Sequence, residues 1–288
     1  MHTLSNDVLT VNVAEHGAEL QNIVKNGVEY LWQGDPAYWA RRSPVLFPIV
    51  GSVWEGRYRV NGQEFTLGQH GFARDMAFTF VSGSQTEVRY RLESSEQTLE
   101  KYPYPFVLEI AYRLHDNKLD VIWEVMNPSD KDLHFQIGAH PAFYYPDYDP
   151  ETKDRGFFSF DRKEGIEYVL ISAKGCADPE VKYPMELKDG MLPINISSFD
   201  RDAFIVEDSQ VRKVTLHRQD GSPWLSMTFD APLVGLWSPP GKNAPFICIE
   251  PWYGRCDRAG FAGEYKEKDW VNILAPGEKF SSVYTIEV

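Results

Sequence analysis

Alternation of apolar and polar residues with a period of two is the pattern that most constrains the fold of this chain. Residues 106–114 carry a large apolar side chain at every second position, and residues 119–125 repeat the pattern after a polar turn at 115–118. A period of two places alternate side chains on one face of an extended strand. The two segments therefore predict an antiparallel β-hairpin.

Two Asn-Gly pairs, Asn26-Gly27 and Asn61-Gly62, also stand between alternating segments. Such pairs favour tight two-residue hairpin turns, in which both central residues need a positive φ. We therefore expect a hairpin around each pair. Similar patterns predict further strands at 8–13, 87–92, 211–216, 224–229, 233–238, 246–250 and 282–288.

Helical periodicity is nearly absent. Residues 94–100 predict one short helix, capped by Ser94 or Ser95 and ending before Pro103 and Pro105.

The 19 prolines and 21 glycines are spread evenly, with no linker or repeat, so we expect one domain over residues 1–288. So many strands must pack face to face or close up, which predicts an all-β sandwich or barrel. Residues 145–198 are poorer in strand pattern and predict an irregular surface excursion.

The net charge excludes some classes of partner. The chain has 29 Lys and Arg residues against 42 Asp and Glu residues, a formal charge of -13. This field repels polyanions, so we expect neither nucleic acid nor an anionic membrane surface as a partner. A neutral ligand such as a sugar is indifferent to the field, whereas a phosphorylated one would need a local basic pocket.

The cysteines and the apolar stretches bear on the compartment. Cys176, Cys248 and Cys256 form no CxxC pair and leave one thiol over in any disulfide scheme, as is usual in a reducing compartment. The first ten residues are polar, and the longest uncharged stretch, 43–54, falls short of the ~20 residues that span a bilayer. We therefore expect a soluble cytoplasmic protein.

Three segments place an ionisable residue beside glycine or proline and among aromatic residues: 69–74, 137–143 and 248–253. His140 and Glu250 each precede a proline, which forces the preceding residue into an extended conformation. Glu250 also closes the apolar run 246–249, so burial would raise its pKa toward that of a useful general base. His140 and Glu250 are therefore candidates for proton transfer.

The same residues could instead have purely structural roles. A histidine is more often structural than catalytic, and Glu250 could pair with Arg74 or Arg255. Trp252 is an ordinary core residue or a platform for the apolar face of a sugar. Two histidines and a glutamate could bind zinc or iron, but no ligand pair has the short spacing of such sites, so we expect no metal. Nucleophile motifs, phosphate-binding glycine loops and dinucleotide fingerprints are missing from the sequence.

Taken together, these segments resemble the aldose 1-epimerase (galactose mutarotase) family, in particular its LacX-type branch of mutarotase-related proteins. The resemblance covers nearly the whole chain. It rests on six ordered blocks at 44–51, 70–74, 102–106, 138–143, 244–252 and 274–278.

The resemblance implies a large antiparallel β-sandwich of the galactose mutarotase type, with a sugar cleft and no cofactor. It implies that Glu250 takes the proton of the anomeric hydroxyl of an aldohexose while His140 protonates the ring oxygen. His70 would bind the sugar near the reacting oxygens. An acid of the segment 200–204 would bind ring hydroxyls, and Asp202 fits the pattern better than Asp200 because Ala203 and Phe204 follow it.

The first histidine block departs from the family pattern. Mutarotases proper carry His-Gly-Gly, whereas this chain has residues 70–74 as His-Gly-Phe-Ala-Arg, a version also found in related hexose-phosphate epimerases. The family's arginine ahead of this block has no exact match, and Arg42 and Arg74 are preferred over Arg41 as its substitutes. Three hypotheses remain: an epimerase of a free aldose such as galactose, a hexose-phosphate 1-epimerase, and a non-catalytic sugar-binding module. We expect a small-molecule sugar as the partner of a monomer or homodimer.

Overall fold

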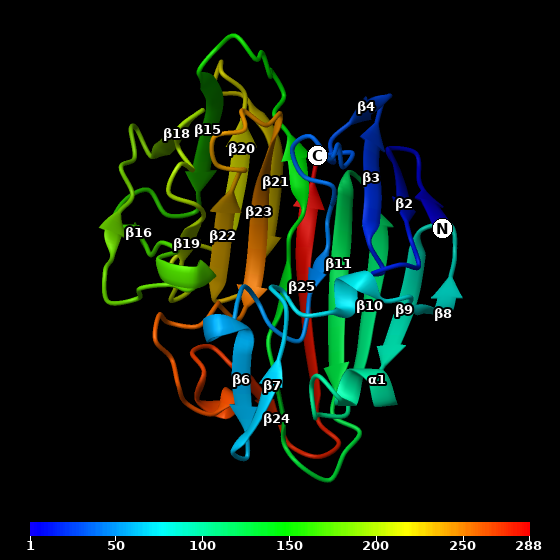
Figure 1. Ribbon diagram of the computed structural model, residues 1–288. Coiled ribbons are helices and arrows are strands. Elements are labelled where there is room, and N and C mark those ends of the chain that lie inside the picture. The colour runs from blue at the N-terminus through cyan, green and yellow to red at the C-terminus, as the bar shows by residue number, and fades with distance from the viewer.

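The computed structural model describes residues 1–288 and consists of layered antiparallel sheets with very little helix (Figure 1). The largest sheet has nine strands. In spatial order they are β18 (Met191–Asn195), β15 (Asp154–Phe160), β20 (Lys213–His217), β21 (Pro223–Phe229), β25 (Lys279–Glu287), β11 (Lys118–Met126), β10 (Val107–His115), β9 (Glu87–Glu93) and β8 (Thr79–Gly83).

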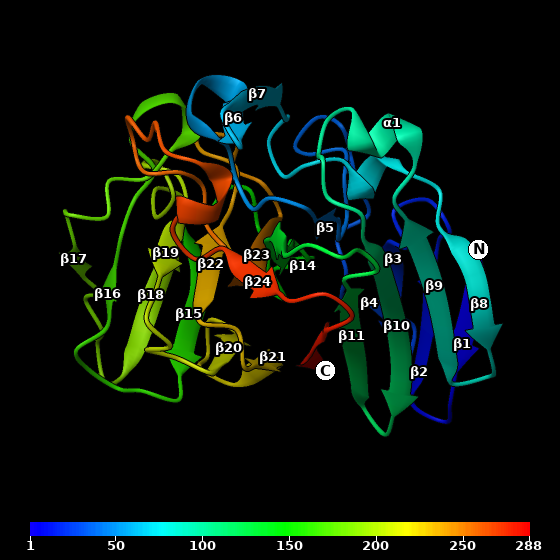
Figure 2. The ribbon, with the colours of Figure 1, turned by 90° about the horizontal axis from the view of Figure 1, so that it is seen from below.

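Two smaller sheets form the second layer, one over each half of the nine-stranded sheet (Figure 2). The first contains β19 (Phe204–Val206), β22 (Leu233–Trp237), β23 (Phe246–Tyr253), β13 (Ile137–Ala139) and β5 (Val45–Leu46), with β14 (Ala142–Tyr144) also paired to β23. The second contains β1 (His2–Ser5), β2 (Leu9–Val13), β3 (Leu20–Lys25) and β4 (Val28–Glu29). The expected all-β sandwich is confirmed.

The remaining elements are short. Three two-stranded ribbons are formed by β6 (Arg57–Val60) with β7 (Gln63–Thr66), β12 (Leu133–Phe135) with β24 (Asn272–Leu274), and β16 (Glu167–Tyr168) with β17 (Tyr183–Pro184). The α-helix α1 (Glu96–Leu99) is capped by the side chain of Ser95, which accepts from the Thr98 N–H. None of the helices has the length and apolar composition needed to cross a membrane.

The predicted hairpins are confirmed. β10 and β11 pair with Leu114 opposite Leu119, as the alternation requires. Asn26 and Gly27 join β3 to β4 with φ values of 52° and 77°, and the Asn61-Gly62 pair joins β6 to β7 in the same conformation. A cluster of 60 buried apolar residues draws on all three large sheets. We propose on this ground that residues 1–288 fold as one domain.

The expectation of an irregular excursion at 145–198 was wrong in part. β15 and β18 lie within this segment and form one end of the nine-stranded sheet. Their pattern is hidden because the register shifts between Asp154 and Phe157, where Gly156 takes a φ of 90°. A β-bulge adds one residue and so breaks the period of two. Only the ribbon β16–β17 and its loops leave the main sheets.

Candidate active site

His140 and Glu250 meet because two interrupted strands keep one register. β13 and β14 both pair with β23, with Gly138 opposite Trp252 and Ala142 opposite Cys248. His140 lies in the break between β13 and β14, so the same register places it opposite Glu250. On the edge away from β23, the His140 backbone N–H donates to the Pro44 carbonyl, just before β5, at 3.1 Å. Directly opposed residues project from the same face of a sheet.

The two side chains form a close, buried pair. The distance from His140 Nε2 to Glu250 Oε2 is 3.4 Å, and the residues are 7% and 1% exposed. The Trp39 indole stacks on the imidazole with ring centroids 4.7 Å apart, and the Trp237 indole meets it edge-on at 5.4 Å. The imidazole is therefore held between two aromatic rings and shielded from bulk water.

The pair opens into a cavity of about 210 Å³. All but one of the residues expected at the site line this cavity: His70, Arg74, His140, Asp202, Glu250 and Trp252. The structure adds Trp39, Gln69 and Trp237, which sequence reasoning missed. Trp39 lies in a loop, where no periodic pattern marks it. Trp237 ends a strand of apolar residues, and the sequence alone does not distinguish it from a core residue.

His70 is held by a pair of backbone groups from Gly51. The His70 N–H donates to the Gly51 carbonyl at 2.8 Å, and the Gly51 N–H donates to His70 Nδ1 at 3.0 Å. Because Nδ1 accepts, the neutral imidazole carries its proton on Nε2. His70 can therefore act as a hydrogen-bond donor, and its ring centroid lies 5.6 Å from that of His140.

Arg74 and Asp202 place charges of opposite sign on the wall of the cavity. Arg74 Nη2 donates to the Gln69 carbonyl at 2.7 Å, whereas its buried Nε has no hydrogen-bond partner. Asp202 holds a positive φ of 72°, and its Oδ1 accepts the Ala203 N–H at 2.8 Å. Aspartate adopts this conformation more readily than most other non-glycine residues. Asp200 does not line the cavity.

Arg42, which we expected at the site, lies against β3. Its Nη1 donates to the Gln21 carbonyl at 2.8 Å, and Arg42 does not line the cavity. Its backbone N–H is bound by the Glu19 carboxylate, which directs the side chain toward β3. Arg41 is held at 2.8 Å by Asp75 and also lies outside the cavity wall.

Burial sets the protonation of the pair. It raises the pKa of Glu250 well above its ordinary value, with the negative charge of Asp202 adding to the effect and the Trp252 indole opposing it. Burial lowers the pKa of His140 to about 3, and the positive charges of Arg74 and Arg41 act in the same direction. Both directions favour uncharged side chains. The favoured state of the pair therefore has its proton on Glu250 and a free basic nitrogen on His140.

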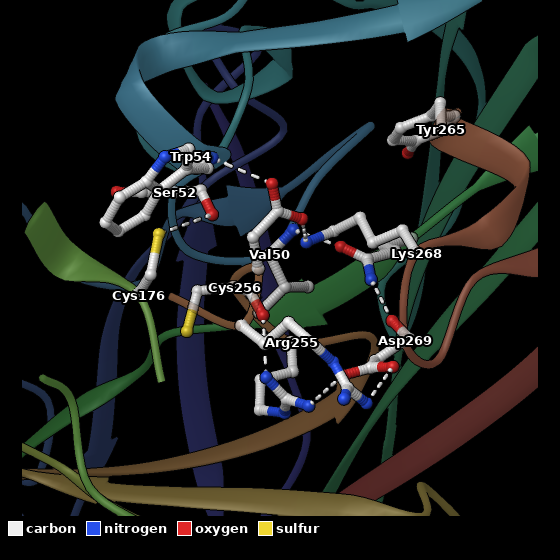
Figure 3. Close-up of polar contacts among 12 residues, drawn as sticks. Val50, Ser52, Trp54, Cys176, Arg255, Cys256, Tyr265, Lys268 and Asp269 are labelled. Carbon is white, nitrogen blue, oxygen red and sulfur yellow. Dashed lines mark hydrogen bonds and ion pairs between the residues drawn. The ribbon is translucent and has the colours of Figure 1, made fainter. Parts of the chain in front are cut away.

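Buried ion pairs surround Cys256 (Figure 3). Arg255 Nε donates to Glu207 Oε1, and its Nη2 donates to Asp269 Oδ2, both at 2.6 Å. Lys268 Nζ lies 2.5 Å from Asp257 Oδ1, and Asp257 Oδ2 accepts the Trp54 N–H at 2.7 Å. Cys256, which lines the cavity, lies between Arg255 and Asp257 in the sequence. The alternative pairing of Glu250 with Arg255 is therefore not formed.

Trp252 lies flat on the sheet because two glycines leave room for it. A Cβ atom on Gly235 would meet Trp252 Cζ2 and Cη2 at 2.6 Å, and one on Gly138 would meet Trp252 Cδ1 at 2.6 Å. The indole N–H donates to the Ala139 carbonyl at 3.2 Å. The ring is thereby fixed beside Glu250.

We predict that Gly235→Ala lowers the free energy of unfolding by about 1–3 kcal/mol, because the added methyl group overpacks a rigid indole. Displacement of Trp252 should also weaken sugar binding. Urea denaturation measures the first effect and sugar titration the second. Gly68→Ala is the control, because a Cβ there meets nothing within 4 Å. Equal stability of the two variants would contradict the packing described for Trp252.

Glu250 also makes stability depend on pH. Its pKa is raised in the folded protein, whereas in the unfolded chain it is about 4.3. Above the unfolded value the folded state therefore binds more protons, so this residue's contribution to stability falls as the pH rises through the raised pKa. We predict that Glu250→Gln unfolds at a higher temperature than the wild type at pH 8, and that the difference shrinks as the pH falls to 4. Thermal unfolding of both proteins between pH 4 and pH 8 measures this difference in unfolding temperature. A difference that grows toward low pH would contradict the raised pKa of Glu250.

Comparison with solved structures agrees with the fold. A solved galactose mutarotase related enzyme from Lactobacillus acidophilus superimposes with a TM-score of 0.91 and 30% identity, over 99% of this chain and 96% of that one. A galactose mutarotase-like protein from Lactobacillus casei gives a TM-score of 0.92 and 29% identity, over 100% and 99% of the two chains. The architecture is that of the galactose mutarotase-like proteins.

The sequence comparisons define the family. The protein LacX (chromosomal) of Lactococcus lactis subsp. lactis is 31% identical over 295 residues, covering 99% of this chain and 98% of that protein. The family model for aldose 1-epimerase matches residues 1–287. The chain therefore belongs to the aldose 1-epimerase family, which implies a small-molecule sugar as its substrate.

Proposed function

We propose that this protein is an aldose 1-epimerase that interconverts the α and β anomers of a free aldohexose. The observation that carries the proposal is the His140–Glu250 pair, buried at 3.4 Å in the cavity wall. Opening a hemiacetal needs one base and one acid at the same time. A pair that holds one transferable proton supplies both without a cofactor.

The proton is first transferred from Glu250 to His140 Nε2 when the sugar enters. Glu250 then accepts the proton of the anomeric hydroxyl, the bond between C1 and the ring oxygen breaks, and His140 protonates the ring oxygen. The aldehyde group rotates about the C1–C2 bond. The reverse steps close the ring from the other face of the carbonyl, which yields the other anomer.

The other residues of the cavity wall suit sugar binding. His70 donates from Nε2 near the reacting oxygens, since its Nδ1 is already occupied by Gly51. Arg74 and Asp202 bind ring hydroxyls as donor and acceptor. Trp252 presents an indole to the apolar face of the pyranose, as aromatic residues do in sugar sites.

The charges on the wall favour a neutral sugar over a sugar phosphate. Arg74 is the sole Lys or Arg among the residues that line the cavity, and Asp202 and Glu250 are acids. Asp75 Oδ2 lies 3.8 Å from Arg74 Nε and already offsets part of its charge. A phosphate clamp by Arg42 and Arg74 would need Arg42 in the cavity, and Arg42 is bound to Gln21 instead. A bidentate Arg–phosphate pair is a strong form of phosphate recognition, and Arg74 alone could offer one here.

The test is a polarimetric assay on freshly dissolved α-glucose, α-galactose and their 6-phosphates. We expect acceleration with the free sugars and a weaker effect with the phosphates. Arg74→Glu should then impair both groups of substrates similarly. A selective loss of activity on phosphates, starting from a preference for them, would establish the hexose-phosphate epimerase instead. Sugar binding by calorimetry without any acceleration would establish a binding module.

A further inference from the structure

Cys248 shares a face of β23 with Glu250, because residues two apart on a strand project to the same side. His140 stands opposite Glu250 on the same face. The ligand atoms of His140, Cys248 and Glu250 all lie within 4.8 Å of one another. Cys248 is fully buried and has no role in the proposed proton transfers. A nitrogen, a sulfur and a carboxylate oxygen thus converge at one point beside the cavity.

We propose that His140, Cys248 and Glu250 form a binding site for one thiophilic divalent cation, of the class of Zn²⁺ or Cd²⁺, which acts as an inhibitor. Zinc sites with three protein ligands and an open fourth position use this kind of donor set. The open position here faces the cavity that His140 and Glu250 line. The cation can therefore enter from the cavity and keep a water molecule as its fourth ligand.

The geometry of two of the three ligands already fits. Bonds of about 2.0–2.1 Å to an imidazole nitrogen and a carboxylate oxygen, at a tetrahedral angle, place the two ligand atoms about 3.4 Å apart. The distance between His140 Nε2 and Glu250 Oε2 is 3.4 Å. Glu250 Oε2 is buried without a hydrogen-bond partner, so the cation displaces no existing bond there. The Cys248 sulfur lies within 4.8 Å of the ligand atoms of both residues and must move closer to them to complete the site.

The charges balance as well. Binding releases the Cys248 thiol proton and the Glu250 carboxyl proton to solvent, so that the cation meets one thiolate, one carboxylate and one neutral imidazole. The dication and two anions sum to zero, which avoids leaving a net charge in a buried site. The thiolate selects soft cations over Mg²⁺ and Ca²⁺, which prefer oxygen ligands.

Cation binding can be tested by titrating the full-length protein with Cd²⁺ and recording the ultraviolet charge-transfer band of a cadmium thiolate. We expect one Cd²⁺ per chain in the wild type and in Cys176→Ala, the matched control for a second buried cysteine outside the cluster. Cys248→Ala should lose the band. Loss of the Glu250 ligand in Glu250→Gln should keep the band but weaken binding by at least on the order of tenfold.

A wild type without the band, or a Cys248→Ala variant that retains it, would overturn the site. If Cys248→Ala does not fold, the Glu250→Gln titration decides: unchanged Cd²⁺ affinity excludes the site.

The inhibitory part rests on the proposed function and is tested by adding Zn²⁺ to the mutarotation assay and then chelating it. We expect loss of activity and recovery; a bound cation with undiminished activity would overturn inhibition. A wild type that binds Cd²⁺ but shows no metal-free activity would refute the proposed function and leave the site standing.

Discussion

Glu250→Gln is expected to lower kcat/KM for mutarotation by about 10²- to 10⁴-fold, the usual contribution of a general base. The amide is nearly isosteric with the carboxylate and fits the same buried position, but it can neither accept the anomeric proton nor pass one to His140. Polarimetry on the better of glucose and galactose measures the loss. Given the pH dependence of stability predicted for Glu250→Gln, this variant should be more stable than the wild type at pH 8 and nearly inactive.

His140→Asn should show a loss of similar size, because ring opening needs both partners. The double variant should be little worse than either single one, since residues that act as a unit are not additive. Glu109→Gln is the matched control, because Glu109 is a partly buried carboxylate paired with Arg89 on the nine-stranded sheet. Full additivity of the two losses, or an equal loss in the control, would contradict the claim that His140 and Glu250 act as a unit.

Lys268→Met is expected to lower the free energy of unfolding by about 3–5 kcal/mol, the cost of leaving a buried charge without its partner. The side chains of Lys268 and Asp257 are 1% and 2% exposed, so water cannot replace the lost ammonium group. Asp257 would keep only the backbone N–H of Trp54. Chemical denaturation measures the loss.

The double variant Lys268→Met with Asp257→Asn should recover part of this stability, because it removes both charges. Lys182→Met is the control: its partner Asp208 is half exposed, and exposed pairs contribute only about 0–1 kcal/mol. A loss in Lys268→Met no larger than that in Lys182→Met would show that the buried pair contributes little. The position of the pair next to Cys256 also predicts weaker sugar binding in Lys268→Met.

The sequence was sufficient for the hairpins and for the sandwich class, because both depend on local signals. Alternation in β10 and β11 and the two Asn-Gly turns are properties of neighbouring residues. β15 could not be recognised, since the bulge at Gly156 interrupts its period of two. Strand order within the sheets likewise depends on contacts between distant segments.

The residues of the site likewise divide into those with a local signal in the sequence and those placed by long-range contacts. His140 and Glu250 stood out because each precedes a proline, but only the common register of β13 and β14 against β23 shows that they face each other. Arg42 lies outside the cavity, which the sequence did not reveal because no local pattern tells where a long flexible side chain points. Trp39 was missed because stacking on His140 is a long-range contact of a loop residue.

Exchange spectroscopy by NMR tests the central claim most directly, because it follows the transfer of the anomeric proton signal between the α and β forms of a sugar at equilibrium. We predict exchange cross-peaks for glucose or galactose with the wild-type protein and none above the spontaneous rate with Glu250→Gln at the same concentration. Equal exchange rates for the two proteins, or no enzyme-dependent exchange with any free or phosphorylated hexose, would contradict an acid–base pair formed by His140 and Glu250.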